Sequence, residues 1–148
     1  MAFPYRRILS PIDFEESSVR AIAVASDFAL SNDGVILLLH VVPFNRLHGG
    51  VPSTAETHRE ELEASRTKLA EIAHRYAGRA RNGLSIRLGD PADGIIKAAL
   101  DFDADVIVMA THGRKGLSHL LIGSVTEGVL RNAVCPVLVI RPAGLPNP

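Results

Sequence analysis

Four short segments of the chain are predominantly apolar and show no alternation with polar residues. They are Ile8 to Leu9, Val35 to Val42, Val106 to Ala110 and Val137 to Ile140. Strands that are covered on both faces lack polar alternation, so these segments are expected to form central parallel strands. In a further segment Leu84, Ile86 and Leu88 alternate with polar residues, which indicates a half-exposed strand near a sheet edge.

Between these segments, apolar side chains recur at the spacing of amphipathic helices. The predicted apolar faces comprise Ala21, Ala25 and Phe28, then Leu62, Leu69, Ile72 and Tyr76, then Ile95, Ile96, Ala99 and Leu100. A last helix is expected from about Ser124 to Asn132. Gly34 and Gly78 are expected to end the first two helices, and Asp90 with Pro91 to begin the third.

The alternation of strands and helices predicts an α/β fold: a single domain over residues 1–148 with an open parallel five-stranded sheet. Right-handed crossovers from a central first strand give the order 3-2-1-4-5, with helices on both faces, as in half of a dinucleotide-binding sheet. The last strand, 137–140, then becomes an edge strand made only of apolar residues. Because such an edge favours aggregation unless it is covered, we expect a homodimer through it.

Two segments are expected to lie outside this framework. The connection from Phe44 to Thr57 contains Gly49 and Gly50, and two interpretations stay open: a mobile lid, or a surface loop without a role. The tail 142–148 is rich in proline and has little to bury, so we expect it to be disordered.

Composition narrows the range of partners. Sixteen basic and sixteen acidic residues give no net charge, which argues against nucleic acid and anionic membranes as partners. No apolar run has the length of a membrane span, and the apolar stretch near the N-terminus is too short for a signal peptide. The single cysteine, Cys135, cannot pair within the chain, so a cytoplasmic location is expected.

The candidate site is expected where neighbouring connections of the sheet leave in opposite directions, between the first and fourth strands. Pro11, Ile12 and Asp13 follow the first strand, and a loop from Ala110 to Gly123 follows the fourth. Both segments therefore belong to one crevice at the carboxyl ends of the strands.

The second segment has the composition of an anion site. It contains Gly113, Gly116 and Gly123, the cations Arg114 and Lys115, and a pattern of Ser124 with Glu127 that predicts a capping box. The N-terminus of a helix favours phosphate through its free amides and its partial positive charge. The alternative interpretation is that the glycines only permit turns and that Ser124 only caps its helix.

Asp13 also has two interpretations. It can cap backbone amides at the start of the first helix, or it can bind a ribose or base, or hold Mg²⁺ that bridges phosphates. Glu15 and Glu16 lie close by and would repel an unaccompanied triphosphate, which favours a bound cation. His112 and His119 stand in no recognisable relation to a nucleophile or to other metal ligands, so no catalytic residue is assigned.

Other nucleotide motifs are absent from the sequence. There is no G-x-x-x-x-G-K-[ST] motif of P-loop NTPases, and no G-x-G-x-x-G follows the first strand.

The chain resembles the universal stress protein family, whose nucleotide-binding members carry G-x-x-G, nine residues, then G-[ST] after the fourth strand. Here the pattern begins Ala110-x-x-Gly113 and closes, nine residues later, with Gly123-Ser124. The segments Pro11-Ile12-Asp13-Phe14, Leu38-Leu39-His40-Val41 and Cys135-Pro136-Val137-Leu138-Val139 resemble the family as well. The one departure in the glycine pattern is Ala110, which stands at the first glycine.

The resemblance implies ATP with Mg²⁺ in the crevice and a homodimer through the last strand. Adenine would contact the backbone of Val41, Asp13 would lie near base, ribose or metal, and Met109 and Ala110 would lie beneath the sugar. Phosphates would meet Gly113, Gly123, Ser124 and Val125, where the residues themselves suggest that Arg114 adds positive charge. The expected function is an ATP-binding stress-response switch or sensor; the alternatives are a dimeric interaction module without nucleotide, or a slow ATP hydrolase.

Overall fold

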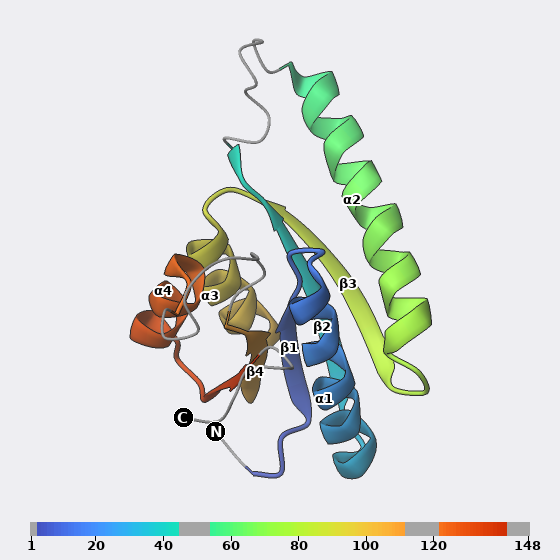
Figure 1. Ribbon diagram of the computed structural model, residues 1–148, viewed down its shortest axis with the longest axis vertical. Helices are drawn as coiled ribbons and strands as arrows, with labels where there is room; N and C mark the ends of the chain where they lie inside the picture. The colour runs from blue at the N-terminus through green and yellow to red at the C-terminus, as the bar shows by residue number, and fades with distance from the viewer. Residues whose placement is uncertain (1–2, 45–53, 112–121, 142–148) are drawn as a thin grey trace.

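The computed structural model describes residues 3–44, 54–111 and 122–141, which form one five-stranded parallel sheet with four helices. The elements in chain order are β1 (Arg7–Pro11), α1 (Glu16–Asn32), β2 (Val35–Val42), α2 (Ala55–Tyr76), β3 (Arg81–Leu88), α3 (Pro91–Phe102), β4 (Val106–Ala110), α4 (Ser124–Asn132) and β5 (Val137–Ile140). The strand order is β3-β2-β1-β4-β5 (Figure 1), which confirms the predicted order and the edge position of the third strand.

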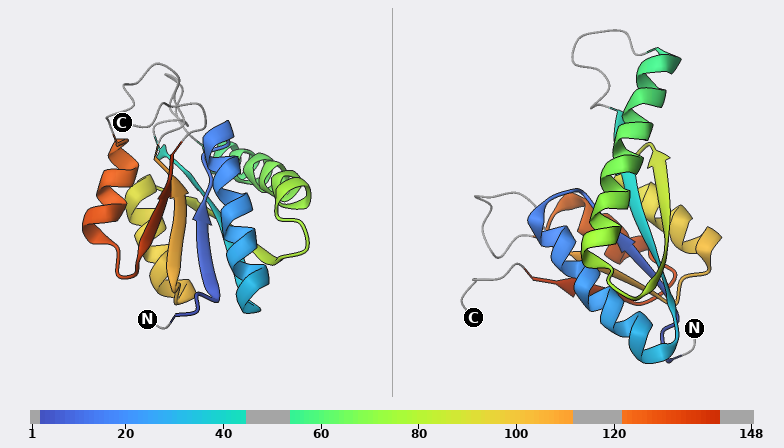
Figure 2. Two further views of the ribbon diagram at one scale, coloured as in Figure 1. Left: turned by 60° about the horizontal axis from the view of Figure 1, so that its bottom comes forward. Right: turned by 90° about the vertical axis from the view of Figure 1, so that its right-hand side faces the viewer.

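The sheet separates two layers of helices. Helices α1 and α2 cover one face, and α3 and α4 lie on the other (Figure 2). Successive residues of a strand point to opposite faces, so Ile8 of β1 enters the core beneath α1 and α2, whereas Leu9 enters the core beneath α3 and α4. Both side chains are fully buried, which explains the absence of polar alternation in the central strands.

The predicted helix faces are correct near the sheet and wrong at two helix ends. Ala21 and Ala25 of α1 and Leu69 of α2 are buried as expected. Tyr76, in contrast, is 42% exposed and Leu100 is 56% exposed. Tyr76 lies in the last turn of α2 against the guanidinium of Arg75, and on α3 the sheet-facing side is taken by other residues of the helix.

The helix ends also refine the expectations. The left-handed residue after α1 is Asp33, with φ 51°, rather than Gly34. Gly34 is required for close approach instead, because a Cβ there would lie 2.5 Å from the carbonyl oxygen of Arg6. Gly78 follows α2 with φ +58°, and Asp90 caps α3 by accepting from the backbone N–H of Asp93 at 3.0 Å, both as predicted.

The long connection ends earlier than predicted, because α2 begins at Ala55 with Thr54 as its N-cap. Residues 45–53 of this connection, 112–121 of the loop after β4, and 142–148 of the tail lie outside the described residues. The interpretation of the connection as a lid or a plain loop, and the expected disorder of the tail, therefore stay predictions. In the described part of the chain, no helix combines the length and apolar character needed to cross a membrane.

Candidate ligand-binding cavity

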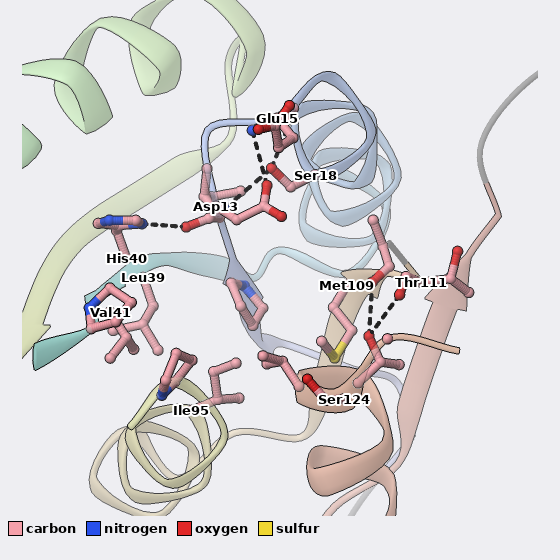
Figure 3. Close-up of a pocket in the computed structure, with 18 of the residues that line it drawn as sticks. Asp13, Glu15, Ser18, Leu39, His40, Val41, Ile95, Met109, Thr111 and Ser124 are labelled. Atoms are coloured by element: carbon pink, nitrogen blue, oxygen red, sulfur yellow. Dashed lines mark hydrogen bonds between the residues drawn. The ribbon is translucent and has the colours of Figure 1, made fainter. Parts of the chain in front are cut away.

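A cavity of about 610 Å³ opens at the carboxyl ends of β1, β2 and β4 (Figure 3). Most of the residues expected at the site line it: Pro11, Ile12, Asp13, Val41, Met109, Ala110, Gly123, Ser124 and Val125. Gly113 and Arg114, together with His112 and His119, lie outside the described residues. The lining also includes residues without an expected role, among them Ser18, Ile95, Thr111 and Thr126.

Three hydrogen bonds among Asp13, Glu15 and Ser18 hold the turn after β1. The backbone N–H of Glu15 donates to Oδ1 of Asp13 at 2.9 Å, which is an Asx turn. The backbone N–H of Asp13 donates to Oγ of Ser18 at 3.3 Å, and that hydroxyl donates to the carbonyl of Glu15 at 2.9 Å. Asp13 therefore does not cap α1, whose N-cap is Glu15 without a side-chain cap bond; the Asx turn uses one of its carboxylate oxygens, and its exposed side chain borders the cavity.

His40 of β2 supports this turn from the sheet. It is only 5% exposed, and its Nδ1 lies 2.6 Å from the carbonyl oxygen of Ile12. Because a carbonyl oxygen only accepts, Nδ1 carries the proton of this bond. The ring also packs on that of Phe14, with centroids 4.1 Å apart, and Nζ of Lys68 lies 4.7 Å from the Phe14 centroid.

The start of α4 forms the opposite wall. Its N-cap is Gly123 rather than Ser124, and within the described part of the chain no side-chain hydrogen bond caps the helix, so the predicted capping box is wrong. Ser124 is the first helical residue, and the carboxylate of Glu127 instead pairs with Arg131 at 2.6 Å. Since no side chain among the described residues caps this helix end, its first amides face the cavity as potential anion donors.

Thr126 joins this helix to the sheet and was not anticipated from the sequence. Its buried hydroxyl shares its one proton between the carbonyl of Ala110 at 3.2 Å and that of Thr111 at 3.0 Å. The backbone N–H of Gly123 also donates to the carbonyl of Thr111, at 3.3 Å. A second hydroxyl two residues after Ser124 is the sequence signal that could have identified this clamp.

The part of the cavity beside β2 and α3 is apolar. Val41, Ile95 and Met109 are all buried and belong to one core cluster. Gly94 of α3 lies against Val41, since a Cβ at Gly94 would come within 2.8 Å of Cγ2 of Val41. One end of the cavity is therefore apolar, whereas the other carries amide donors on α4 and carboxylates on the β1 turn.

An open parallel sheet with a ligand-sized cavity at its switch point defines a Rossmann-like α/β protein. The chain belongs to the universal stress protein family, because residues 4–141 match the family's sequence model.

Relatives support this assignment along nearly the whole chain. Universal stress protein MJ0531 of Methanocaldococcus jannaschii is 33% identical over 142 residues, covering 93% of this chain and 82% of that protein. The solved structure of hypothetical protein MJ0577 is 29% identical with a TM-score of 0.83, covering 95% of this chain and 99% of that one.

Two further structures share the fold and were solved with nucleotides. A universal stress protein in complex with cAMP is 20% identical with a TM-score of 0.68, covering 93% of this chain and 97% of its own. A universal stress protein from Archaeoglobus fulgidus in complex with dAMP is 21% identical with a TM-score of 0.66, covering 91% and 97%.

Proposed function

We propose that the cavity binds an adenine nucleotide, with ATP as the physiological ligand, and that the protein acts as a nucleotide-dependent switch or sensor in a stress response. The observation that carries this proposal is that one cavity combines the N-terminus of α4, which no described side chain caps, with an apolar slot beside Val41. Relatives of this fold solved with cAMP and dAMP agree with it.

The apolar end suits a base. A purine buries a flat apolar surface and needs only a few polar groups to fix its orientation. Val41 and Ile95 provide the apolar surface, and the backbone of Val41 would contact the base edge. Met109 and Ala110 would then lie beneath the ribose.

The opposite end suits phosphate. The first amides of α4, at Ser124 and Val125, offer donors and a partial positive charge. Gly113 and Arg114 are proposed to contribute from the loop that precedes α4.

Asp13 is proposed to hold Mg²⁺ together with phosphate oxygens. Mg²⁺ in nucleotide sites commonly uses one or two carboxylates, the phosphates and water. One oxygen of Asp13 lies outside the Asx turn, and the exposed carboxylate of Glu15 borders the same cavity, so the residues present fit such an ion. In the described part of the chain no group of three or more metal-ligating side chains gathers, so the ligand's own oxygens would complete the coordination.

Calorimetric titration with ATP and Mg²⁺, and separately with AMP, tests this function. We expect binding that raises the melting temperature, and an Asp13→Asn variant that binds ATP with Mg²⁺ about tenfold more weakly. The matched control is Asp27→Asn on the exposed side of α1. Absence of any shift with either nucleotide at millimolar concentration would favour an interaction module without a nucleotide.

Efficient hydrolysis is not part of the proposal, which assigns none of the described residues to orienting an attacking water. Native mass spectrometry of the freshly purified protein should show bound adenine nucleotide. A steady-state ATPase rate of about one per second, abolished by Asp13→Asn or Ser124→Ala, would replace the switch by an enzyme.

We also propose a homodimer through β5, located in the cytoplasm. Leu138 on this edge strand is 36% exposed, and Leu130 and Val134 nearby are exposed as well. The N–H of Ile107 donates to the carbonyl of Pro136, and that of Thr111 donates to the carbonyl of Ile140, so even-numbered residues of β5 make their backbone hydrogen bonds to β4. The backbone N–H and carbonyl of Val139 therefore point away from β4, toward the open edge of the sheet. A Val139→Pro variant should therefore sediment as a monomer while keeping the β4 ladder, whereas a wild-type monomer at micromolar concentration would refute the dimer.

A further inference from the structure

β1 and β2 separate at the mouth of the cavity. The last paired residues are Pro11 and Leu39, and β2 continues to Val42 after β1 has ended. Ile12 makes one more bond, because its N–H donates to the carbonyl of Leu39 at 2.7 Å. The next bond of a parallel ladder would run from the N–H of Val41 to the carbonyl of Ile12.

The alternation along β2 gives the direction of the Val41 backbone. The N–H of Val35 donates to Arg6, and the carbonyl of Leu39 accepts from Ile12, so odd-numbered residues of β2 bond toward β1. Val41 is two residues beyond Leu39 and faces the same way. Its N–H and carbonyl therefore point to the side where β1 has ended, and Val41 lines the cavity there.

The ladder bond from the N–H of Val41 to the carbonyl of Ile12 is not made between these residues, both of which the structure describes. The carbonyl of Ile12 instead accepts from Nδ1 of His40 at 2.6 Å. The bond that this carbonyl makes thus comes from a side chain and not from the amide of Val41. The same ring packs on Phe14, which has a left-handed φ of 69°, a strained conformation that a non-glycine residue keeps only where its surroundings hold it.

We propose that His40 is a positioning residue for the ligand. It holds the carbonyl of Ile12, so that β1 and β2 do not pair one residue further and the amide of Val41 remains available to the edge of a bound base. Through Ile12 and Phe14, the two neighbours of Asp13, it also holds the Asp13 carboxylate at the cavity wall. The effect on the ligand rests on the proposed adenine-nucleotide function, whereas the effect on the Val41 amide does not.

Amide hydrogen exchange, measured by NMR on the nucleotide-free protein, tests the structural part. In the unmodified protein the amide of Val41 should exchange faster than that of Leu39, which lies within the ladder. In His40→Leu the ladder can extend, and exchange at Val41 should slow. In His40→Asn the side-chain amide takes the place of Nδ1–H, so Val41 should exchange as in the unmodified protein. His74→Leu on the exposed side of α2 is the matched control.

Calorimetric titration with AMP tests the functional part. His40→Leu should bind AMP about tenfold more weakly, the effect of losing roughly one buried hydrogen bond, and His40→Asn should recover most of that loss. A buried histidine with only a structural role would change the melting temperature without this pattern in Val41 exchange and AMP affinity.

The outcomes separate the two proposals. If the unmodified protein binds neither AMP nor ATP with Mg²⁺, the proposed function fails, while Val41 exchange still decides the role of His40. Equal protection of Val41 and Leu39 in the nucleotide-free protein overturns that role, as does a His40→Leu variant that leaves exchange and affinity unchanged. Should His40→Leu not fold, the comparison of Val41 with Leu39 and the His40→Asn variant decide.

Discussion

The hydroxyl of Thr126 donates to the carbonyl oxygen of Ala110 at 3.2 Å, and so joins the first turn of α4 to the last residue of β4. The same hydroxyl donates to Thr111 at 3.0 Å, and Thr126 is only 3% exposed. This clamp sets the position of the uncapped amides of α4 relative to the sheet, and hence to Asp13 on the other wall.

Replacing Thr126 by valine should therefore weaken both the fold and the site. The variant keeps the shape but leaves two carbonyls without this donor, so the free energy of unfolding should fall by about 1–2 kcal/mol. AMP should bind about threefold to tenfold more weakly, because the amides of α4 are less well positioned. Denaturant unfolding and calorimetry measure the two effects. Thr126→Ser, which keeps the hydroxyl, is the control, and a valine variant with unchanged AMP affinity would contradict the role of the clamp.

Ala110→Gly tests the departure from the family's glycine pattern. Ala110 is not among the described non-glycine residues with positive φ, which are Phe14, Asp33 and Asp103, so its backbone does not require glycine. Its methyl group can then weaken binding only by contact with the ribose. Removing it should strengthen AMP binding severalfold, while glycine in a strand lowers the free energy of unfolding by about 0.5–1 kcal/mol. An unchanged or weaker affinity would show that the methyl group does not oppose the sugar.

Gly94→Ala should lower the melting temperature when residue 41 is valine and raise the melting temperature when Val41 is replaced by alanine. A Cβ at Gly94 would lie 2.8 Å from Cγ2 and 3.0 Å from Cγ1 of Val41 but 3.5 Å from its Cβ. In the unmodified protein the substitution should lower the melting temperature, because the stiff valine side chain must move. In a Val41→Ala background the clash disappears, and the gain in helix propensity of about 1 kcal/mol should raise it. Thermal denaturation of the four proteins of this cycle measures the effect, and the same sign in both backgrounds would contradict it.

Cys135 should react slowly with thiol reagents. Burial raises the pKa of its thiol, and the charge of Asp105 raises it further, while a backbone hydrogen bond at Ile107 lowers it. Alkylation by iodoacetamide at pH 8 should therefore be much slower in the folded protein than in denaturant.

The same shift makes stability depend on pH. Because the thiol ionises more readily in the unfolded chain, its contribution is complete below the unfolded pKa of about 8.5 and is lost as the pH rises toward the raised pKa of the folded protein. Cys135→Ala removes this dependence, so the two proteins should differ less in unfolding free energy at pH 10 than at pH 7. A difference that does not change with pH would contradict the assignment.

Much of the fold was predictable because it depends on local patterns. The central strands were identified from predominantly apolar runs without polar alternation, and the edge position of β3 from the alternation of Leu84 and Ile86 with polar residues. The strand order follows from the handedness of crossover connections. Tyr76 was misplaced because a helical period identifies a face but not how far along a helix the sheet extends beneath it.

The site was predictable in outline only. Asp13 and Ser124 were expected at one crevice because the carboxyl ends of β1 and β4 are neighbours in this topology. The capping box predicted at Ser124 is absent, since Gly123 is the N-cap and Glu127 pairs with Arg131. The pattern of side chains in the sequence does not reveal this pairing. The role of Thr126 depends on its contact with Thr111, which is 15 positions away, and the role of His40 on its contact with Ile12, which is 28 positions away. Local spacing in the sequence does not reveal such contacts.

The sequence by itself determined the alternating strands and helices, the parallel sheet and the crevice between β1 and β4, because apolar periodicity and crossover handedness are properties of consecutive residues. Only the tertiary structure decided which polar groups meet there. Whether His40 or Val41 takes the carbonyl of Ile12 depends on where β1 and β2 separate. The contact of Thr126 with Ala110 is likewise a product of the tertiary structure, because it forms only when the start of α4 packs against the end of β4.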